Sequence, residues 1–148
     1  MNRMTNNNAP ALKTELDFLT KKLEENIQKS PYSYRSYLLL IDLNRANSQI
    51  FDQFKIIDAE TVANKAIKIA PKNPFAYWSL ISIEISMKNF QQAIDLAKRV
   101  IEIEPELEKS YQLLIKAAKF QGNVDLVNDT ISKAIKINPS WENDLKSI

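Results

Sequence analysis

The side chains in this chain that could do chemistry are carboxylates and cations, because the sequence has no His and no Cys. The commonest general base and metal ligand is therefore absent, as are thiolate nucleophiles, disulfides and zinc–thiolate sites. The single glycine, Gly122, excludes a glycine-rich phosphate-binding loop. No pair of Asp or Glu residues stands out from a solvated helix face. The sequence thus predicts a protein that is not an enzyme and that holds no metal and no cofactor.

The charged residues remain as candidates for binding. The 20 Lys and Arg and the 18 Asp and Glu leave a net charge of +2, so bulk electrostatics do not favour nucleic acid as a partner. No apolar run reaches the about 18 residues that span a bilayer, so no direct membrane insertion is expected. The prediction that remains is a protein or peptide partner, and the elements that position the side chains decide where it binds.

A constant interval organises the chain. Three prolines, Pro71, Pro105 and Pro139, each follow the previous one by 34 residues, and each closes a similar six-residue phrase. A fixed period of this length is typical of repeats that consist of one pair of antiparallel helices. Proline lacks an N–H and is accepted only in the first turn of a helix, so each proline separates two pairs.

Apolar residues between the prolines recur every three or four positions, as on the buried face of a helix. In one repeat Tyr77 and Leu80 mark the first helix, and Ala93 and Ala97 mark the second. In the next repeat Gly122 lies between the two helices, where the backbone can adopt a positive φ. The pattern therefore predicts helix pairs throughout the repeats.

With these features the chain resembles the tetratricopeptide repeat (TPR) family over about residues 34–139. The resemblance rests on aromatic, aliphatic, small and proline positions that recur in register, namely Tyr37, Leu40, Ala59, Ala66 and Pro71; Tyr77, Leu80, Phe90, Ala93 and Pro105; and Tyr111, Leu114, Gly122, Ala134 and Pro139. It implies an all-α fold, a TPR-type α-solenoid of about three helix pairs with flanking capping helices.

The expected organisation has four parts. They are a disordered tail at residues 1–10, an N-terminal capping helix at 11–30, the TPR domain at 31–139 and a short C-terminal helix at 140–148. The three repeats are expected at about 34–71, 74–105 and 108–139.

The first repeat is longer than the others, because Pro31 lies 40 residues before Pro71. The six extra residues are expected as an insertion at 47–57. This segment is apolar for a loop, and large exposed apolar side chains are unfavourable. The insertion is therefore expected to fold back on the helices.

A looser resemblance covers residues 23–80, from Leu23-Glu24-Glu25 through Phe51-Asp52 to Tyr77-Trp78. This region is similar to the TPR tails that follow the membrane domain of some bacterial O-antigen ligase-like proteins. It implies an alternative function, a soluble tail or scaffold module associated with such a membrane protein in glycan assembly. A cytoplasmic location is favoured, with the soluble tail of a bacterial inner-membrane assembly as the alternative.

In the TPR family the first helices of successive repeats line a concave groove, so the resemblance places the binding side chains there. The predicted partner-binding residues are Arg35, Asp42, Arg45, Phe75, Trp78, Ser82, Lys109, Gln112, Lys116 and Lys119. Five of them are cations and one is an acid, in a chain that is nearly neutral. The pattern indicates a peptide or partner helix with acidic groups beside an apolar anchor.

Each of these positions also has a plain structural interpretation. Trp78 would contribute ~2 kcal/mol or more as a buried interface anchor, or it packs within the repeats. The cations would equally form a solvated helix face with local ion pairs. The two-carboxylate clamp by which some TPR proteins hold chaperone tails is not expected. Among the matching positions only Lys109 has the required side chain, and Asp42 would repel a carboxylate.

Self-association is a second hypothesis. The C-terminal helix is short and carries Trp141, Leu145 and Ile148, whereas terminal repeats need polar outer faces to remain monomeric. The expectation is a monomer or weak self-association.

Overall fold

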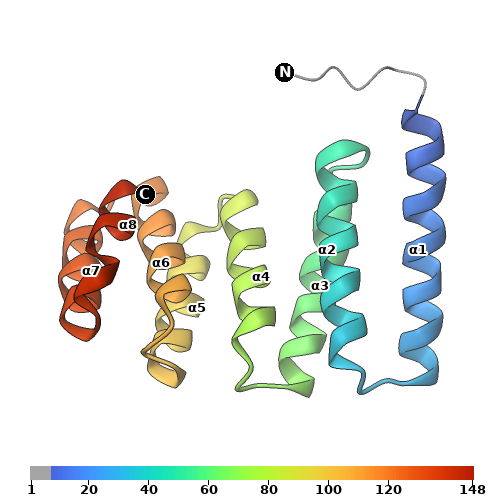
Figure 1. The fold of residues 1–148 in the computed structure, drawn as a ribbon. Helices are drawn as coiled ribbons and strands as arrows, with labels where there is room; N and C mark the ends of the chain where they lie inside the picture. Colours follow the sequence, from blue (N-terminus) through green and yellow to red (C-terminus); the bar gives the residue numbers. More distant parts are fainter. Residues whose placement is uncertain (1–7) are drawn as a thin grey trace. The chain divides into compact units, whose positions relative to one another are not determined.

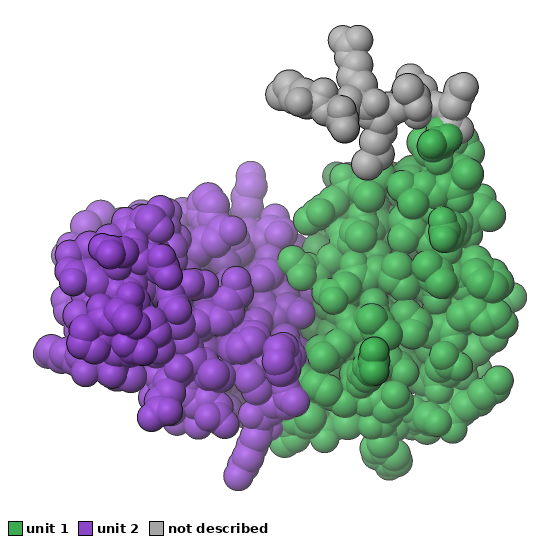
Figure 2. Space-filling model, viewed as in Figure 1, with its two compact units in different colours: residues 1–71 green, residues 72–148 purple. Residues whose placement is uncertain are grey.

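The computed structural model describes residues 8–148, and within this range the chain is helical with no strand (Figure 1). The prediction of an all-α fold is therefore confirmed. The helices form two compact units, Met1–Pro71 and Lys72–Ile148, which Figure 2 shows in different colours. They are called unit 1 and unit 2 below.

Unit 1 contains three helices, α1 (Ala9–Lys29), α2 (Tyr34–Ile50) and α3 (Lys55–Ile69). Helix α2 packs against both of the others. It buries Tyr37, Leu40 and Ile41, which are three and four residues apart and so share one face. Helix α3 contributes three alanines that are fully buried, Ala59, Ala63 and Ala66. Side chains this small let the backbones of paired helices approach closely.

The N-terminal helix begins earlier than expected. Helix α1 starts at Ala9, with Pro10 in its first turn, whereas the sequence indicated a start at residue 11. Proline is well accepted there because the first N–H groups of a helix have no intrahelical partner. Residues 1–7 of the expected tail lie outside the described residues.

The extra residues of the first repeat lengthen its helices. Helices α2 and α3 have 17 and 15 residues, against 13 and 14 in the following pair, and their link is Phe51–Phe54. The expected fold-back is wrong, because the side chains of Ile50, Phe54 and Ile57 are 50%, 68% and 51% exposed. Continued helix satisfies one backbone hydrogen bond for each added residue, which a folded-back loop would have to replace.

Unit 2 contains two helix pairs and a closing segment. The pairs are α4 (Pro74–Ser86) with α5 (Phe90–Ile103), and α6 (Glu108–Gln121) with α7 (Val124–Ile137). A 3₁₀ turn (Pro139–Trp141) and helix α8 (Glu142–Ser147) follow. Asn73 caps α4, because its Oδ1 accepts a hydrogen bond from the Phe75 amide at 3.1 Å.

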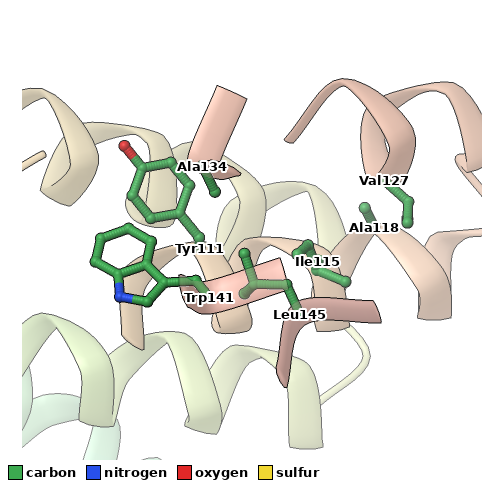
Figure 3. Packing of buried hydrophobic residues seen from close by; sticks show 7 residues of the cluster. All are labelled: Tyr111, Ile115, Ala118, Val127, Ala134, Trp141 and Leu145. Carbon is green, nitrogen blue, oxygen red and sulfur yellow. The ribbon is translucent and has the colours of Figure 1, made fainter. Parts of the chain in front are cut away.

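The closing segment completes the core of the last pair. Trp141 and Leu145 are 9% and 0% exposed, and Figure 3 shows them beside residues of α6 and α7. The Trp141 ring lies 5.8 Å from the ring of Tyr111. Two of the three side chains behind the self-association hypothesis are therefore buried within unit 2.

In two repeats, a tyrosine of the first helix forms a hydrogen bond with the proline in the segment before that helix. The Tyr37 hydroxyl donates to the carbonyl of Pro31 at 3.1 Å, and the Tyr111 hydroxyl donates to the carbonyl of Pro105 at 3.0 Å. Both bonds span six residues. The repeated tyrosine thus packs in the core with its ring and fixes the proline link with its hydroxyl.

Candidate partner-binding groove

A cavity of about 630 Å³ lies on the exposed side of α6 in unit 2. Four of its lining residues, Lys109, Gln112, Lys116 and Lys119, come from that helix. They are separated by three, four and three positions, so they share one helical face. Ser82 of α4 lines the same cavity. The structure therefore brings together five of the ten predicted binding residues.

The cavity is positively charged. None of the ion pairs among the described residues includes Lys109, Lys116 or Lys119. Elsewhere in unit 2 the lysine Lys133 is 2.7 Å from a carboxylate of its own helix. Gln112 donates from Nε2 to Glu108 Oε1 at 3.0 Å. The three ammonium groups are thus available to an anionic group from outside.

Apolar side chains lie among the cations. Leu113, Phe120 and Ile148 line the cavity, and sequence reasoning did not include them in the site. Leu113 and Phe120 each follow a cavity lysine by four residues, so helical spacing alone would have found both. Ile148 follows α8 and had no signal in the sequence, because only the packing of α8 brings it there.

Trp78 and Phe75 lie outside this cavity but within the same unit. Their rings meet edge to face, with centroids 5.2 Å apart. The indole Nε1 of Trp78 donates to Ser110 Oγ at 3.0 Å, and Ser110 is fully buried. This bond joins α4 to α6 and fixes the indole, which is partly buried, while Phe75 is 54% exposed.

The remaining predicted residues belong to unit 1. Arg35, Asp42 and Arg45 all lie on α2. Arg45 Nη1 is 3.8 Å from Asp42 Oδ1, so these two side chains form a local ion pair. Their part in binding stays a prediction.

A second cavity in unit 2, of about 260 Å³, lies among α5, α6 and α7. It carries charges of both signs: Lys98 and Glu102 of α5 line it, together with Lys133 and Asp129, which pair with each other. Its smaller size and its mixed charge make it a weaker candidate for partner binding than the cavity of about 630 Å³, which is called the groove on α6 below.

Two other kinds of site, a metal centre and a membrane span, are absent from residues 8–148. In this range no three acidic side chains gather where they could hold a metal ion. None of the helices there is long and apolar enough to cross a membrane.

Sequence comparisons relate the chain to subunits of larger complexes. It is 32% identical over 94 residues to anaphase-promoting complex subunit 3 of Dictyostelium discoideum, and 26% identical to the human NatB auxiliary subunit, N-alpha-acetyltransferase 25. These matches cover 64% and 80% of the chain, but only 10% and 13% of the two relatives. No model of a known protein family matches the chain.

Solved structures show the same fold. The crystal structure of MamA has a TM-score of 0.69 and 20% identity, covering 95% of this chain and 78% of MamA. A thermophilic TPR protein of Thermus thermophilus, TTC0263, has a TM-score of 0.72 and 14% identity, covering 91% and 73%. The resemblance to TPR proteins is confirmed, and the fold is a TPR-type α-solenoid.

These likenesses establish the fold of the chain. The looser resemblance to the tails of O-antigen ligase-like proteins finds no support in them.

Proposed function

We propose that this chain is a non-catalytic TPR module that binds an acidic peptide or partner helix through the groove on α6. The observation that carries the proposal is the cavity of about 630 Å³ with three lysines that have no carboxylate partner among the described residues. Leu113, Phe120 and Ile148 beside them would receive an apolar side chain of the partner. Most pockets that bind ligands combine apolar walls with a few placed polar groups in this way.

The cations contribute mainly to specificity and to the rate of association. The lysines are solvent-exposed, so each contact with a partner carboxylate contributes about 0.2–1 kcal/mol and is weakened by salt. A positive groove also speeds the encounter with an acidic segment and slows the approach of a basic one. Affinity then depends chiefly on the apolar contacts that the partner makes.

The aromatic pair at the start of α4 extends the proposed surface. Phe75 is more than half exposed, and the internal hydrogen bond of Trp78 holds the adjacent indole in place. A side chain that is already fixed loses little entropy on binding. Trp78 and Phe75 are therefore proposed as an apolar platform next to the cationic groove.

Capture of the partner from the native cell tests the proposal. Wild-type protein is compared with the triple variant Lys109→Glu/Lys116→Glu/Lys119→Glu. The control is Lys98→Glu, which reverses the charge of one lysine on α5, outside the groove. We expect wild type and the control to retain the same partner and the triple variant to lose it, with unchanged helicity and melting temperature. Retention of the partner by a folded triple variant would contradict the proposal.

A further inference from the structure

We infer that the partner segment bound on α6 is itself an acidic amphipathic helix, aligned along α6 with carboxylates at matching positions. This inference rests on the proposed function and goes one step beyond it, because a TPR groove can hold either an extended peptide or a helix. The positions of the lysines along α6 distinguish the two.

The three lysines define two intervals. Lys109 and Lys116 are seven residues apart, and Lys119 follows three residues later. At a rise of about 1.5 Å per residue these intervals are about 10.5 Å and about 4.5 Å along the helix axis. A second helix beside α6 presents its own residues seven and three apart at the same two intervals, on one face.

Extended partners do not match this pattern. In a strand the side chains on one face repeat every two residues, so carboxylates recur at about 6.6 Å and about 13 Å. A polyproline helix repeats every three residues, at about 9.3 Å, which is close to the longer interval but twice the shorter one. A helix alone among these conformations reproduces both intervals.

The apolar residues of the groove follow the same periodicity. Leu113 lies one turn after Lys109, and Phe120 lies one turn after Lys116. These four residues have the spacing of a heptad seam, and charged and apolar side chains alternate among them along one face of α6. Its complement is a helix whose acidic residues alternate with apolar ones, a common mode of helix-in-groove recognition.

The walls of the cavity leave room for such a helix face. Ser82 of α4 and Ile148, after α8, line the cavity together with the residues of α6. The Ser82 hydroxyl donates to the Trp78 carbonyl at 2.9 Å, so it presents lone pairs but no free proton to the groove. About 630 Å³ of space accommodates several side chains, which is what one face of a short helix inserts.

Synthetic probe peptides test the inference. The first is an alanine-based helix with Glu at i, i+3, i+7 and i+10 and leucines beside them, a pattern that reads the same in both directions. The second has the same composition with Glu spread around the helix. The third is the first peptide with a central proline, which breaks the helix. Fluorescence anisotropy at low salt should show the first binding at least about tenfold more tightly than the other two.

Variants of the protein distinguish a failure of the helical-partner inference from a failure of the groove proposal. Lys116→Glu should lose the first peptide, Lys98→Glu should retain it, and the triple Lys→Glu variant should instead bind a peptide with Lys at the Glu positions. If the proline peptide binds wild type as tightly as the first peptide and Lys116→Glu loses both, the helix is ruled out and the groove remains. If no peptide binds, or if Lys116→Glu binds as wild type does, the groove proposal fails as well.

Discussion

Helices α4 and α6 occupy the same place in successive repeats but carry different chemistry on their exposed sides. Their buried sides share three residues at equivalent positions, with Tyr77, Leu80 and Ile81 in one and Tyr111, Leu114 and Ile115 in the other. On the exposed side, where α4 has Phe75, Ser82 and Ile85, helix α6 has Lys109, Lys116 and Lys119. The buried residues that are shared serve the packing of both helices. The exposed residues differ, and those of α6 form the proposed binding surface.

The two repeats also differ inside. Glu84 of α4 is fully buried, and its carboxylate accepts from Asn89 Nδ2 at 2.9 Å and from Gln92 Nε2 at 3.0 Å. The equivalent residue of α6 is Ala118, which is equally buried among apolar side chains. One repeat thus holds a hydrogen-bonded carboxylate where the next holds a methyl group. Exchanging or removing such features shows which of these differences the stability of unit 2 depends on.

The largest effect is expected from Ala118→Glu. In the third repeat Asn123 stands at the position equivalent to Asn89. Leu126 stands at the position equivalent to Gln92, so this second donor is missing. A buried carboxylate without adequate partners costs about 3–5 kcal/mol. Urea denaturation should show a loss of this size, and adding Leu126→Gln should recover part of it. Full stability of the single variant would show that the two interiors are interchangeable.

Trp78→Ala should have the next largest effect. The change removes a partly buried indole and leaves the Ser110 hydroxyl, which is fully buried, without its partner. We expect a loss of about 2–3 kcal/mol in the free energy of unfolding. At the equivalent position of the next repeat, Gln112→Ala should change stability by less than about 0.5 kcal/mol. Equal losses for the two variants would mean that the α4 position contributes no more to stability than the equivalent α6 position does.

Tyr111→Phe tests the bond that fixes the proline link. Loss of the hydrogen bond to the Pro105 carbonyl should cost about 1 kcal/mol near neutral pH. Burial raises the pKa of the Tyr111 hydroxyl above its ordinary value. Because the pKa of this hydroxyl is raised in the folded state, its contribution to the free energy of unfolding is complete below about pH 10. The contribution declines as the pH rises towards the folded pKa.

The measurement is the difference in unfolding free energy between wild type and Tyr111→Phe at a series of pH values. The difference should shrink above about pH 10. A difference that does not depend on pH would contradict the role of burial. Tyr37→Phe is the matched change in unit 1, where the same bond joins Tyr37 to Pro31.

The smallest effect concerns the turn between paired helices. Gly122 and Lys88 are equivalent, and both have positive φ, 80° and 66°. A lysine in this left-handed conformation costs of order 1 kcal/mol relative to glycine. Lys88→Gly should therefore raise the free energy of unfolding by about 0.5–1 kcal/mol, and Gly122→Ala should lower it by a similar amount.

Thermal melts of the two turn variants provide the check. Apart from the adjoining backbone and chain neighbours, no atom lies within 4 Å of the place where a Cβ would stand at Gly122, so a loss in Gly122→Ala would reflect backbone strain and not a clash. Opposite shifts in melting temperature are expected. Shifts of the same sign would mean that the two turns are not equivalent.

The segment between α2 and α3 in the first repeat could not be predicted from its local sequence pattern. The apolar segment around Phe54 was expected to fold back, because exposure of several large side chains is unfavourable. In the structure α2 extends to Ile50 and α3 begins at Lys55, so only a short link remains between them. Phe54 in this link is 68% exposed. The backbone hydrogen bonds of a continuing helix outweighed the burial of a few side chains.

The sequence by itself determined the helix pairs of this protein, their 34-residue period and the buried face of each helix. These follow from helical periodicity and from proline and glycine chemistry, which act over a few residues. Tertiary structure alone decided that Ile148 lines the same cavity as the lysines of α6, and that the Trp78 indole donates to a serine 32 residues away. Such contacts depend on how separate helices pack against one another, and no spacing along a single helix encodes that.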